Sequence, residues 1–579
     1  MKDASRQDQP EIKRILQSAK SGFVAVGVFS LFINLLMLVQ PFYMLQVFDR
    51  VLRSRSTETL LFLSLVVLGL FILMGILQFI RSRILVRVGV ALDERLGGRL
   101  FDAMFRNSLR QRGGGSPQAI DDLSNVRQFL TGPGILALFD APWMPVYLGV
   151  MFLFNTWLGI YGVACTLIIG ALTWANEVFT RAPLAKANEA NRNARRFAGD
   201  NLRNAEVIHA MGMETAVRDR WLARQARTIN GQAFASDRAG VFSNASRVFR
   251  FMAQAFAYGI GALLVLQGQM SGGMIIACAI LIGRALAPLD QITGAWRQIQ
   301  QARESYDRLT KLFDGFPEQP RHTSLPAPQG RLQLTNVLAA PPGTRNPVLR
   351  GVAFNVEPGE GLGVIGPSAA GKSSLVRVIL GIWPLLNGSV RLDGADVDQY
   401  NRDEIGPYIG YLPQDIELFE GTVSQNIARF GEADDESIVA AAKLAGAHEM
   451  ILQLPDGYDT AVGVGGNTLS AGQRQRVGLA RALFGTPRLV ILDEPNSNLD
   501  DAGEQALTGA VQRLKAQGVT VLVVTHRRSI LAQMDKLLVL QQGQVAAFGA
   551  RDEVLSRLQS NTAQPLRVAG GQQNKGAPQ

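Results

Sequence analysis

The stretch "GVIGPSAAGKSSLVRVIL", residues 363–380, decides how the second half of the chain folds. It contains the pattern G-x-x-x-x-G-K-[ST] between an apolar strand-like run and a helix-like run, which is the context that this pattern requires. Backbone N–H groups of residues 367–373 are expected to bind phosphate groups, with Lys372 neutralising the β and γ phosphates and Ser373 binding Mg²⁺. The predicted nucleotide-binding residues of this loop are Gly366, Pro367, Ser368, Ala369, Ala370, Gly371, Lys372, Ser373 and Ser374.

A second stretch, "LVILDEP" at residues 489–495, predicts a buried strand that ends in two carboxylates. Asp493, at the carboxyl end of the strand, is expected to hold Mg²⁺, largely through water. Glu494 is expected to orient and deprotonate the attacking water. An Asp-Glu pair after a strand is explained equally well as a capping carboxylate, so this interpretation depends on the phosphate loop upstream in the same domain.

Two further polar residues are predicted to complete the γ-phosphate site. Gln414, in "YLPQDIELF", lies at a strand-to-loop transition, where its amide could contact Mg²⁺ and water. His526, in "VVTHRR", ends another buried strand. A lone histidine is more often a satisfied core residue, but the spacing after the Asp-Glu pair favours a catalytic role. The predicted catalytic residues are therefore Glu494, His526, Gln414 and Lys372.

The stretch "LSAGQRQRVGLARAL", residues 469–483, predicts a second phosphate-binding element. Small residues precede a helix-like run that has three arginines and no acid, so backbone N–H groups and the helix dipole can face an anion. Ser470, Gly472 and Gln473 are the expected contacts. One nucleotide-binding domain would thus carry two phosphate-binding elements.

The first half of the chain is apolar enough to cross a membrane. The 579 residues are 47% hydrophobic and only 18% charged. Six apolar stretches, at 21–48, 57–80, 134–154, 158–180, 250–269 and 272–293, are each near the roughly 20 residues that a spanning helix needs. Burial in a large soluble core is excluded by residues 59–79, which carry no charge. We expect an α-helical membrane domain of six transmembrane helices, followed by an α/β P-loop NTPase domain, because short strands alternate with helices there.

The distribution of arginine indicates the orientation in the membrane. Residues 1–20, 81–133 and 181–249 are rich in Arg and Lys, which predicts that they are cytosolic and that both termini are inside. The loop 49–56, with three arginines predicted outside, is discordant. The two long segments are helical in pattern and are expected to turn near 112–123 and 195–207. This placement of charge also argues against a nucleic-acid partner, despite the net charge of +10.

The composition predicts five segments: a leader at 1–20, the membrane domain at 21–315, a Pro-rich linker at 316–330, the nucleotide-binding domain at 331–560, and a disordered tail at 561–579. The leader has no Cys or His and is too short to fold as a peptidase. Cys165 and Cys278 are expected to be small buried hydrophobes rather than a disulfide, and His209, His322 and His448 lack metal-ligand spacing.

Taken together, the motifs of the second half resemble the nucleotide-binding domain of ABC transporters, in the family's order and over some 200 residues. The resemblance implies that Ser470 and Gly472 contact ATP held by the P-loop of another subunit, so that the chain works as a homodimer. Three departures stand out. Ala471 replaces a usual glycine, and "LAAPPGTRNP" at 338–347 lacks the aromatic residue that stacks on adenine in many relatives. Val464 stands where exporters usually have a glutamate that helps to couple the domains.

Within this family, "QPFYMLQVFDRVLRSRSTETL" (40–60) and "DAPWMPVYL" (140–148) resemble the type I protein-secretion exporters, in particular the metalloprotease-secretion, PrtD-like branch. This implies a bacterial inner-membrane ATPase that works with a periplasmic adaptor (membrane fusion protein) and an outer-membrane channel. It also implies a secreted protein substrate with an uncleaved C-terminal signal. A lipid or drug flippase, a soluble or DNA-tethered ATPase, and an ATP-gated channel or regulator remain as alternatives.

Overall fold

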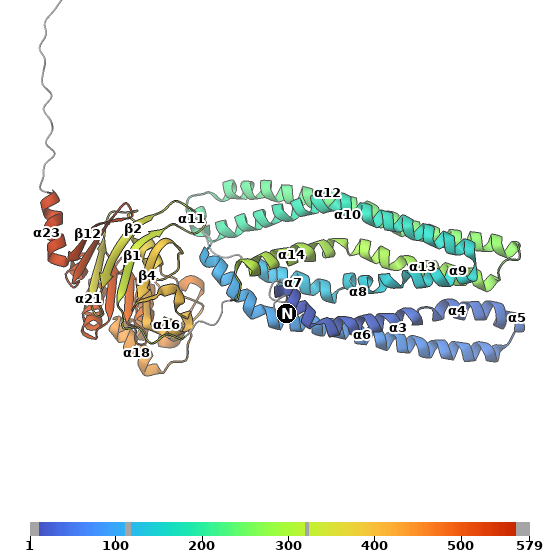
Figure 1. The fold of residues 1–579 in the computed structure, drawn as a ribbon, viewed down its shortest axis with the longest axis horizontal. Coiled ribbons are helices and arrows are strands. Elements are labelled where there is room, and N and C mark those ends of the chain that lie inside the picture. The colour runs from blue at the N-terminus through green and yellow to red at the C-terminus, as the bar shows by residue number, and fades with distance from the viewer. Residues whose placement is uncertain (1–10, 111–116, 319–323, 563–579) are drawn as a thin grey trace, which may run out of the picture. The chain divides into compact units, whose positions relative to one another are not determined.

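The computed structural model describes residues 11–110, 117–318 and 324–562. These residues form two compact units (Figure 1): the first holds residues 11–107 and 117–318, and the second holds 108–110 and 324–562. The first ten residues of the predicted leader, part of the predicted turn at 112–123, His322, and all but two residues of the predicted tail lie outside the described residues.

The first unit is helical, and its long helices run side by side in Figure 1. Two of them form the longest hairpin, in which α10 packs along α12. The elements in chain order are α2 (Glu11–Ser18), α3 (Lys20–Leu36), α4 (Val39–Gln46), the π-helix η1 (Val47–Val51), α5 (Leu52–Ser54), α6 (Thr57–Arg110), α7 (Gln118–Thr131), α8 (Pro133–Asp140), η2 (Ala141–Trp143), α9 (Met144–Phe154), α10 (Thr156–Leu202), α11 (Ala205–Ala210), α12 (Glu214–Leu266), α13 (Gly272–Gly294) and α14 (Trp296–Gly315).

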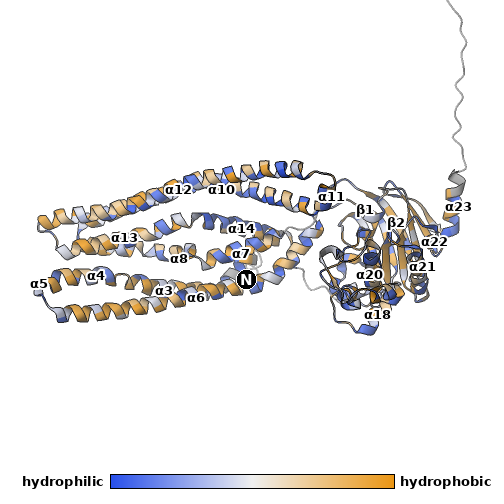
Figure 2. Ribbon diagram, turned by 180° about the vertical axis from the view of Figure 1, so that it is seen from behind, coloured by the Kyte–Doolittle hydropathy of each residue, from blue (hydrophilic) through white to orange (hydrophobic). Residues whose placement is uncertain are grey.

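Six helical segments of the described chain are long and apolar enough to span a membrane, which confirms the predicted number. The most apolar 18-residue window of α6 has none of its residues buried within the chain. Figure 2 shows apolar colour concentrated in the half of the unit that holds α4, α9 and the start of α13, and more polar colour toward α11 and α14. An apolar surface of this extent is stable only against lipid or another apolar surface.

Two of the predicted spans are interrupted helices. The stretch predicted at 21–48 breaks at Met37 and Leu38 and then passes through η1. The stretch predicted at 134–154 breaks at η2, between α8 and α9. Proline explains the second break, because Pro142 and Pro145 cannot donate backbone hydrogen bonds. The turn predicted at 195–207 lies slightly later in the chain, since α10 continues to Leu202 and α11 follows before α12.

A buried polar network joins four segments of the membrane unit. Arg81 of α6 pairs with Asp140 at the end of α8, with 2.8 Å between Nη1 and Oδ1, and it also donates to the hydroxyl of Ser30 in α3. Asn34 of α3 donates to the same Asp140 carboxylate at 3.0 Å. The hydroxyl of Tyr147 in α9 donates to the side-chain oxygen of Asn34 at 2.7 Å. Every one of these polar groups therefore has a partner on another helix.

A second interhelical contact lies where α12 passes into α13. The Asp49 carboxylate, in η1, accepts hydrogen bonds from the Ser271 hydroxyl and, at 3.0 Å, from the Gly273 backbone N–H. A Cβ atom at Gly273 would lie 2.9 Å from this carboxylate and from the Leu45 carbonyl oxygen, so glycine is required for the close approach. The negative side chain also suits the positive end of the helix dipole.

The second unit combines two main sheets. The elements are β1 (Leu332–Ala339), β2 (Leu349–Val356), β3 (Gly361–Ile365), α15 (Lys372–Ile379), β4 (Leu385–Leu392), β5 (Ala395–Asp396), η3 (Val397–Gln399), α16 (Arg402–Ile405), η4 (Gly406–Tyr408), β6 (Ile409–Leu412), β7 (Gly421–Thr422), α17 (Val423–Ile427), α18 (Asp435–Leu444), α19 (His448–Leu452), η5 (Gly457–Asp459), β8 (Ala461–Val462), η6 (Val464–Gly466), α20 (Ala471–Leu483), β9 (Leu489–Asp493), α21 (Asp501–Ala516), β10 (Thr520–Val524), α22 (Arg528–Leu531), β11 (Lys536–Gln541), β12 (Gln544–Ala550) and α23 (Arg551–Thr562).

The larger sheet has the order β12-β11-β3-β10-β9-β6 and is parallel except for β12. This confirms the predicted α/β fold. The sheet of order β2-β1-β4-β5 is antiparallel and was not predicted. Strands β9 and β10 are buried along their whole length, as expected for central parallel strands with both faces covered.

Candidate functional site

The phosphate loop and the predicted γ-phosphate residues lie at the carboxyl ends of four adjacent parallel strands. The phosphate loop follows β3, His526 follows β10 by two residues, Asp493 ends β9, and Gln414 follows β6 by two residues. Since β3, β10, β9 and β6 are neighbours in that order, residues up to 160 positions apart meet at one edge of the sheet. Open parallel sheets bind ligands at this edge.

The phosphate loop is built around backbone conformations that favour glycine. Gly366 has a φ of 158°, and a Cβ there would lie 2.2 Å from the Leu540 carbonyl oxygen. Gly371 has a φ of 101° and is the residue from which α15 begins. Ala369 also adopts a left-handed conformation, with a φ of 64°. A loop that turns in this way into a helix N-terminus presents N–H groups to an anion.

The conformation of the phosphate loop leaves only some of its backbone N–H groups available to contact phosphate. Pro367 has no backbone N–H to donate. The N–H of Ala370 donates to the Pro367 carbonyl oxygen at 3.2 Å. Gly366, Pro367 and Ala370 shape the loop, and Ser374 lies in the first turn of α15. Within the predicted range of 367–373, the candidate donors that remain are the N–H groups of Ser368, Ala369, Gly371, Lys372 and Ser373.

Lys372 lies over the loop and is buried, with 8% of its surface exposed. Its Nζ donates to the carbonyl oxygens of Gly366 at 2.7 Å and Pro367 at 3.2 Å, and lies 3.1 Å from Nε2 of His526. An ammonium group can only donate, so Nε2 of His526 accepts and the ring proton is on Nδ1. The structure thus brings two predicted catalytic residues into direct contact across 154 positions of sequence.

Asp493 is suited to hold a divalent cation. Only 3% of it is exposed, and its Oδ1 is buried without a hydrogen-bond partner. Burial raises the pKa of Asp493, while the hydrogen bond with Ser373 acts in the opposite direction. Among the described residues no group of three or more His, Cys, Asp or Glu could hold a metal. Ser373 and Asp493 would therefore share Mg²⁺ with phosphate oxygens and water, which is how proteins commonly bind this ion.

Glu494 has a different environment from its neighbour. It is only partly buried and has a φ of 51°, an uncommon conformation for a non-glycine residue. Its backbone N–H is held by the Val524 carbonyl oxygen at 2.8 Å. The Gln414 side-chain amide donates to the Glu494 carboxylate at 3.2 Å. Strain at a position fixed from two sides is typical of functional sites, and it leaves this carboxylate beside the Gln414 amide.

The second predicted phosphate-binding element begins α20. Ser470 is the N-cap, its hydroxyl accepts from the Gln473 N–H at 3.3 Å, and the Gln473 side chain accepts from the Ser470 N–H at 2.8 Å. The Ser470 hydroxyl therefore keeps its own proton for donation to an anion. Ala471 is exposed, so its methyl group is accommodated. A Cβ at Gly472 would lie 3.0 Å from the Asn498 carbonyl oxygen, which favours glycine there.

The two phosphate-binding elements belong to different parts of the unit. Ala370 and Leu375 lie in the hydrophobic cluster that contains β1, β2 and β4, whereas Leu469 and Val477 lie in the cluster that contains α17 and α18. Within the described chain, no hydrogen bond or ion pair joins residues 366–374 to residues 469–473. The two phosphate-binding elements are thus supported by different hydrophobic clusters of the unit.

Gln475 is a site residue that the sequence analysis missed. It is buried, with 1% exposed, and it accepts from the Asn498 N–H at 3.0 Å and donates to the Pro495 carbonyl oxygen. It thereby joins α20 to the loop after Glu494. A second missed contact is the 3.1 Å hydrogen bond from the Thr525 hydroxyl to Asn496, which links the loops after β10 and β9. The only sequence signal was their proximity to His526 and to the Asp-Glu pair.

Comparison with known proteins agrees with this geometry. Residues 349–497 match the model of the ABC transporter family, and residues 23–288 match that of the ABC transporter transmembrane region. The type I secretion system ATP-binding protein PrsD of Rhizobium meliloti is 47% identical over 94% of this chain and 94% of its own. The chain belongs to the ABC transporter family.

Other relatives are less similar in sequence, but they also match more than nine-tenths of this chain. The cyclolysin secretion/processing ATP-binding protein CyaB of Bordetella pertussis is 31% identical over 92% of this chain and 75% of its own. The leukotoxin translocation ATP-binding protein LktB of Mannheimia glucosida is 28% identical over 92% and 76%. A solved structure of a bacterial Atm1-family ABC exporter with ATP bound is similar in fold, with a TM-score of 0.81, 23% identity, and coverage of 96% of this chain and 100% of that chain.

These relatives bear on the alternatives left open by the sequence. PrsD, CyaB and LktB match nearly the whole chain and are secretion and translocation proteins, which supports an ATP-driven protein exporter rather than a lipid or drug flippase. The match to the transmembrane region and the six apolar helical segments exclude the soluble ATPase. The ABC transporter domain and the type I secretion relatives support ATPase activity.

Proposed function

We propose that this ABC transporter is the inner-membrane ATPase of a type I secretion system, and that it uses ATP hydrolysis to export a protein. The observation that carries the choice of cargo is the similarity to PrsD over 94% of both chains. ATP hydrolysis at the carboxyl ends of β3, β10, β9 and β6 would supply the energy for export. The six apolar helical segments supply the membrane unit through which a cargo would pass.

The geometry supports a division of labour among the site residues. Lys372 and the N–H groups of the phosphate loop would bind the ATP phosphates. Mg²⁺, held by Ser373 and Asp493 and sensed by Gln414, would neutralise phosphate charge when bound. Glu494 would accept the proton of the attacking water, and Gln414 fixes the carboxylate of Glu494 by its 3.2 Å hydrogen bond. His526 would contact the γ-phosphate once Lys372 turns toward the nucleotide.

We further propose that two copies form the working transporter. The supporting observation is that Ser470 and Gly472 lie in a different part of the unit from the phosphate loop. In a homodimer, each Ser470 would donate its free hydroxyl proton to ATP held by the Lys372 of the other copy. Such a dimer has two shared ATP sites.

The proposal also includes the orientation of the chain in the inner membrane and two partners, a periplasmic adaptor and an outer-membrane channel. The excess of arginine and lysine in residues 81–133 and 181–249 favours cytosolic positions for these segments and for both termini. A periplasmic adaptor and an outer-membrane channel would continue the path beyond the inner membrane. The cargo would carry a C-terminal signal that is retained in the secreted product.

The test is secretion in cells that contain this chain, a periplasmic adaptor, an outer-membrane channel and a candidate cargo. We expect the cargo in the medium with both ends intact by mass spectrometry, and no cargo when its last roughly fifty residues are deleted. A phospholipid-translocation assay in proteoliposomes is the matched control, and should show no ATP-dependent movement. ATP-dependent lipid movement without secretion would contradict the proposal.

A further inference from the structure

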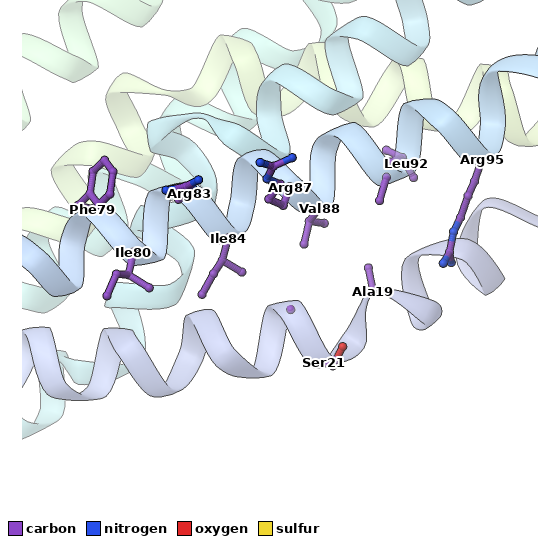
Figure 3. Close-up of a pocket in the computed structure, with 12 residues that line it drawn as sticks. Ala19, Ser21, Phe79, Ile80, Arg83, Ile84, Arg87, Val88, Leu92 and Arg95 are labelled. Atoms are coloured by element: carbon purple, nitrogen blue, oxygen red, sulfur yellow. The ribbon is translucent and has the colours of Figure 1, made fainter.

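A groove lies between the start of α3 and the middle of α6, within the membrane unit (Figure 3). Its volume is about 540 Å³. Figure 3 shows Ile80, Ile84 and Val88 projecting from α6 toward α3. The two helices come close at one point, because a Cβ added to Gly22 would lie 2.7 Å from a methyl group of Val88. The floor of the groove is therefore apolar.

Three arginines of α6 border this apolar floor. Arg83, Arg87 and Arg95 all line the groove, and all three side chains are exposed. No Asp or Glu is among the lining residues. Arg83 and Arg87, one helical turn apart, make no hydrogen bond or ion pair with any residue that the structure describes. The groove thus combines an apolar floor with two positive charges that have no negative partner in the described part of the chain.

The groove lies where the apolar part of α6 meets its polar part. The charge-free run of α6 ends at Ile80, and α3 begins at Lys20. With a rise of about 1.5 Å per residue, Ile80 and Arg87 lie roughly 10 Å apart along the axis. The groove therefore crosses from the apolar part of the span to its polar end, where the headgroups and the first carbons of lipid chains meet.

We propose that this groove binds an anionic phospholipid, with its phosphate between Arg83 and Arg87 and an acyl chain against Ile80, Ile84 and Val88. The charge complements a phosphodiester, and the apolar floor complements a hydrocarbon chain. A free phosphate would leave the floor empty, and an acidic peptide would bring polar backbone groups to it without partners. The inference does not depend on the exported cargo, so it stands or falls separately from the proposed function.

The test is native mass spectrometry of the full chain in detergent, titrated with phosphatidylglycerol and with phosphatidylcholine. We expect preferential retention of phosphatidylglycerol. Arg83→Gln and Arg87→Gln should each weaken its retention about fivefold, and the double variant roughly thirtyfold. Arg247→Gln changes an exposed arginine of α12 outside the groove and is the matched control. A similar loss in this control would mean that general surface charge attracts the lipid, and would overturn the proposal.

A second variant tests the apolar part separately. Ala91→Phe adds an aromatic ring to the groove lining without changing the charge, so it should weaken the retention of phosphatidylglycerol. Glycerol phosphate, which has no acyl chain, should not bind to the unmodified protein or to any variant. Retention that survives both Ala91→Phe and the double arginine variant would overturn the proposal. A double arginine variant that changes only the ratio of dimer to monomer would also overturn the proposal, because the groove would then be an interface between copies of the chain. Displacement of the lipid by an acidic peptide would overturn it as well.

Discussion

Asp493 and Glu494 are adjacent in sequence, but the structure gives them different chemistry. Asp493 is buried at the end of a central strand, with an oxygen that lacks a partner, and burial raises its pKa. Glu494 is turned out of the strand by its left-handed backbone and is held by Gln414. A buried oxygen suits a cation, whereas a partly exposed and oriented carboxylate suits a water molecule. We therefore expect binding and hydrolysis to be separable by mutation.

Glu494→Gln should keep ATP binding close to that of the unmodified protein and reduce hydrolysis at least about a hundredfold. An amide of the same size can hold water but cannot accept its proton. Nucleotide binding and the rate of phosphate release would be measured on the purified protein in lipid. Glu436→Gln, at an exposed position in the first turn of α18, is the control and should leave both unchanged. Near-normal hydrolysis by Glu494→Gln would show that another group acts as the base.

At the scale of elements, the polar residues of the two stretches that resemble secretion exporters join helices to one another. Asp140 and Tyr147 of "DAPWMPVYL" belong to the network around Arg81, and Gln40 of "QPFYMLQVFDRV" accepts a 3.0 Å hydrogen bond from Arg284 of α13. In the same stretch, Asp49 contacts the start of α13. Polar side chains in apolar surroundings are stabilising only when all of them are paired.

Asp140→Ala should destabilise the membrane unit, because it leaves the guanidinium of Arg81 buried without its carboxylate. The expected loss is about 3 kcal/mol in the free energy of unfolding. The double variant Arg81→Met with Asp140→Leu removes both charges and should recover most of this loss. Thermal unfolding of the three proteins in the same lipid discs gives the comparison. If the double variant is no more stable than Asp140→Ala, the ion pair is not the reason for the loss.

These elements also show how far sequence reasoning reaches. Local patterns predicted the helical spans and the central parallel strands, because an uncharged run such as 59–79 and a strand such as "LVILD" carry their own signal. The phosphate loop and the Asp-Glu pair were predicted from local patterns too, and His526 from its spacing after that pair; their roles in hydrolysis stay predictions. The antiparallel sheet was missed because its strands pair with register shifts that blur their alternation. Contacts such as Arg81 with Asp140 or Lys372 with His526 join residues far apart in sequence, and no local pattern reports them.

At the scale of the whole molecule, the separation of the two phosphate-binding elements predicts how two lesions combine. Lys372→Ala and Ser470→Arg should each inactivate a homodimer, the first by removing a phosphate contact and the second by adding bulk at the start of α20. In a mixed dimer with one lesion in each copy, one shared site carries both lesions and the other carries neither. Hydrolysis by cross-linked mixed dimers, compared with each homodimer, gives the result.

We expect the mixed dimer to hydrolyse ATP at roughly half the rate of the unmodified dimer, because one intact site remains. A mixed dimer of Lys372→Ala with an unmodified copy, which also keeps one intact site, is the matched control for coupling between sites. Hydrolysis by the control but none by the double-lesion dimer would contradict the shared-site arrangement, since the two lesions would then affect separate sites.

The hydrogen bonds between Asp49 and the start of α13 have a mechanical consequence. They connect the segment between α4 and α6 to the turn between α12 and α13. Gly273 allows the two segments to pack closely, because a side chain there would not fit. Together with the hydrogen bond from Arg284 to Gln40, this contact holds α13 to α4 and η1 at two separate points, so these three elements would move as one rigid piece.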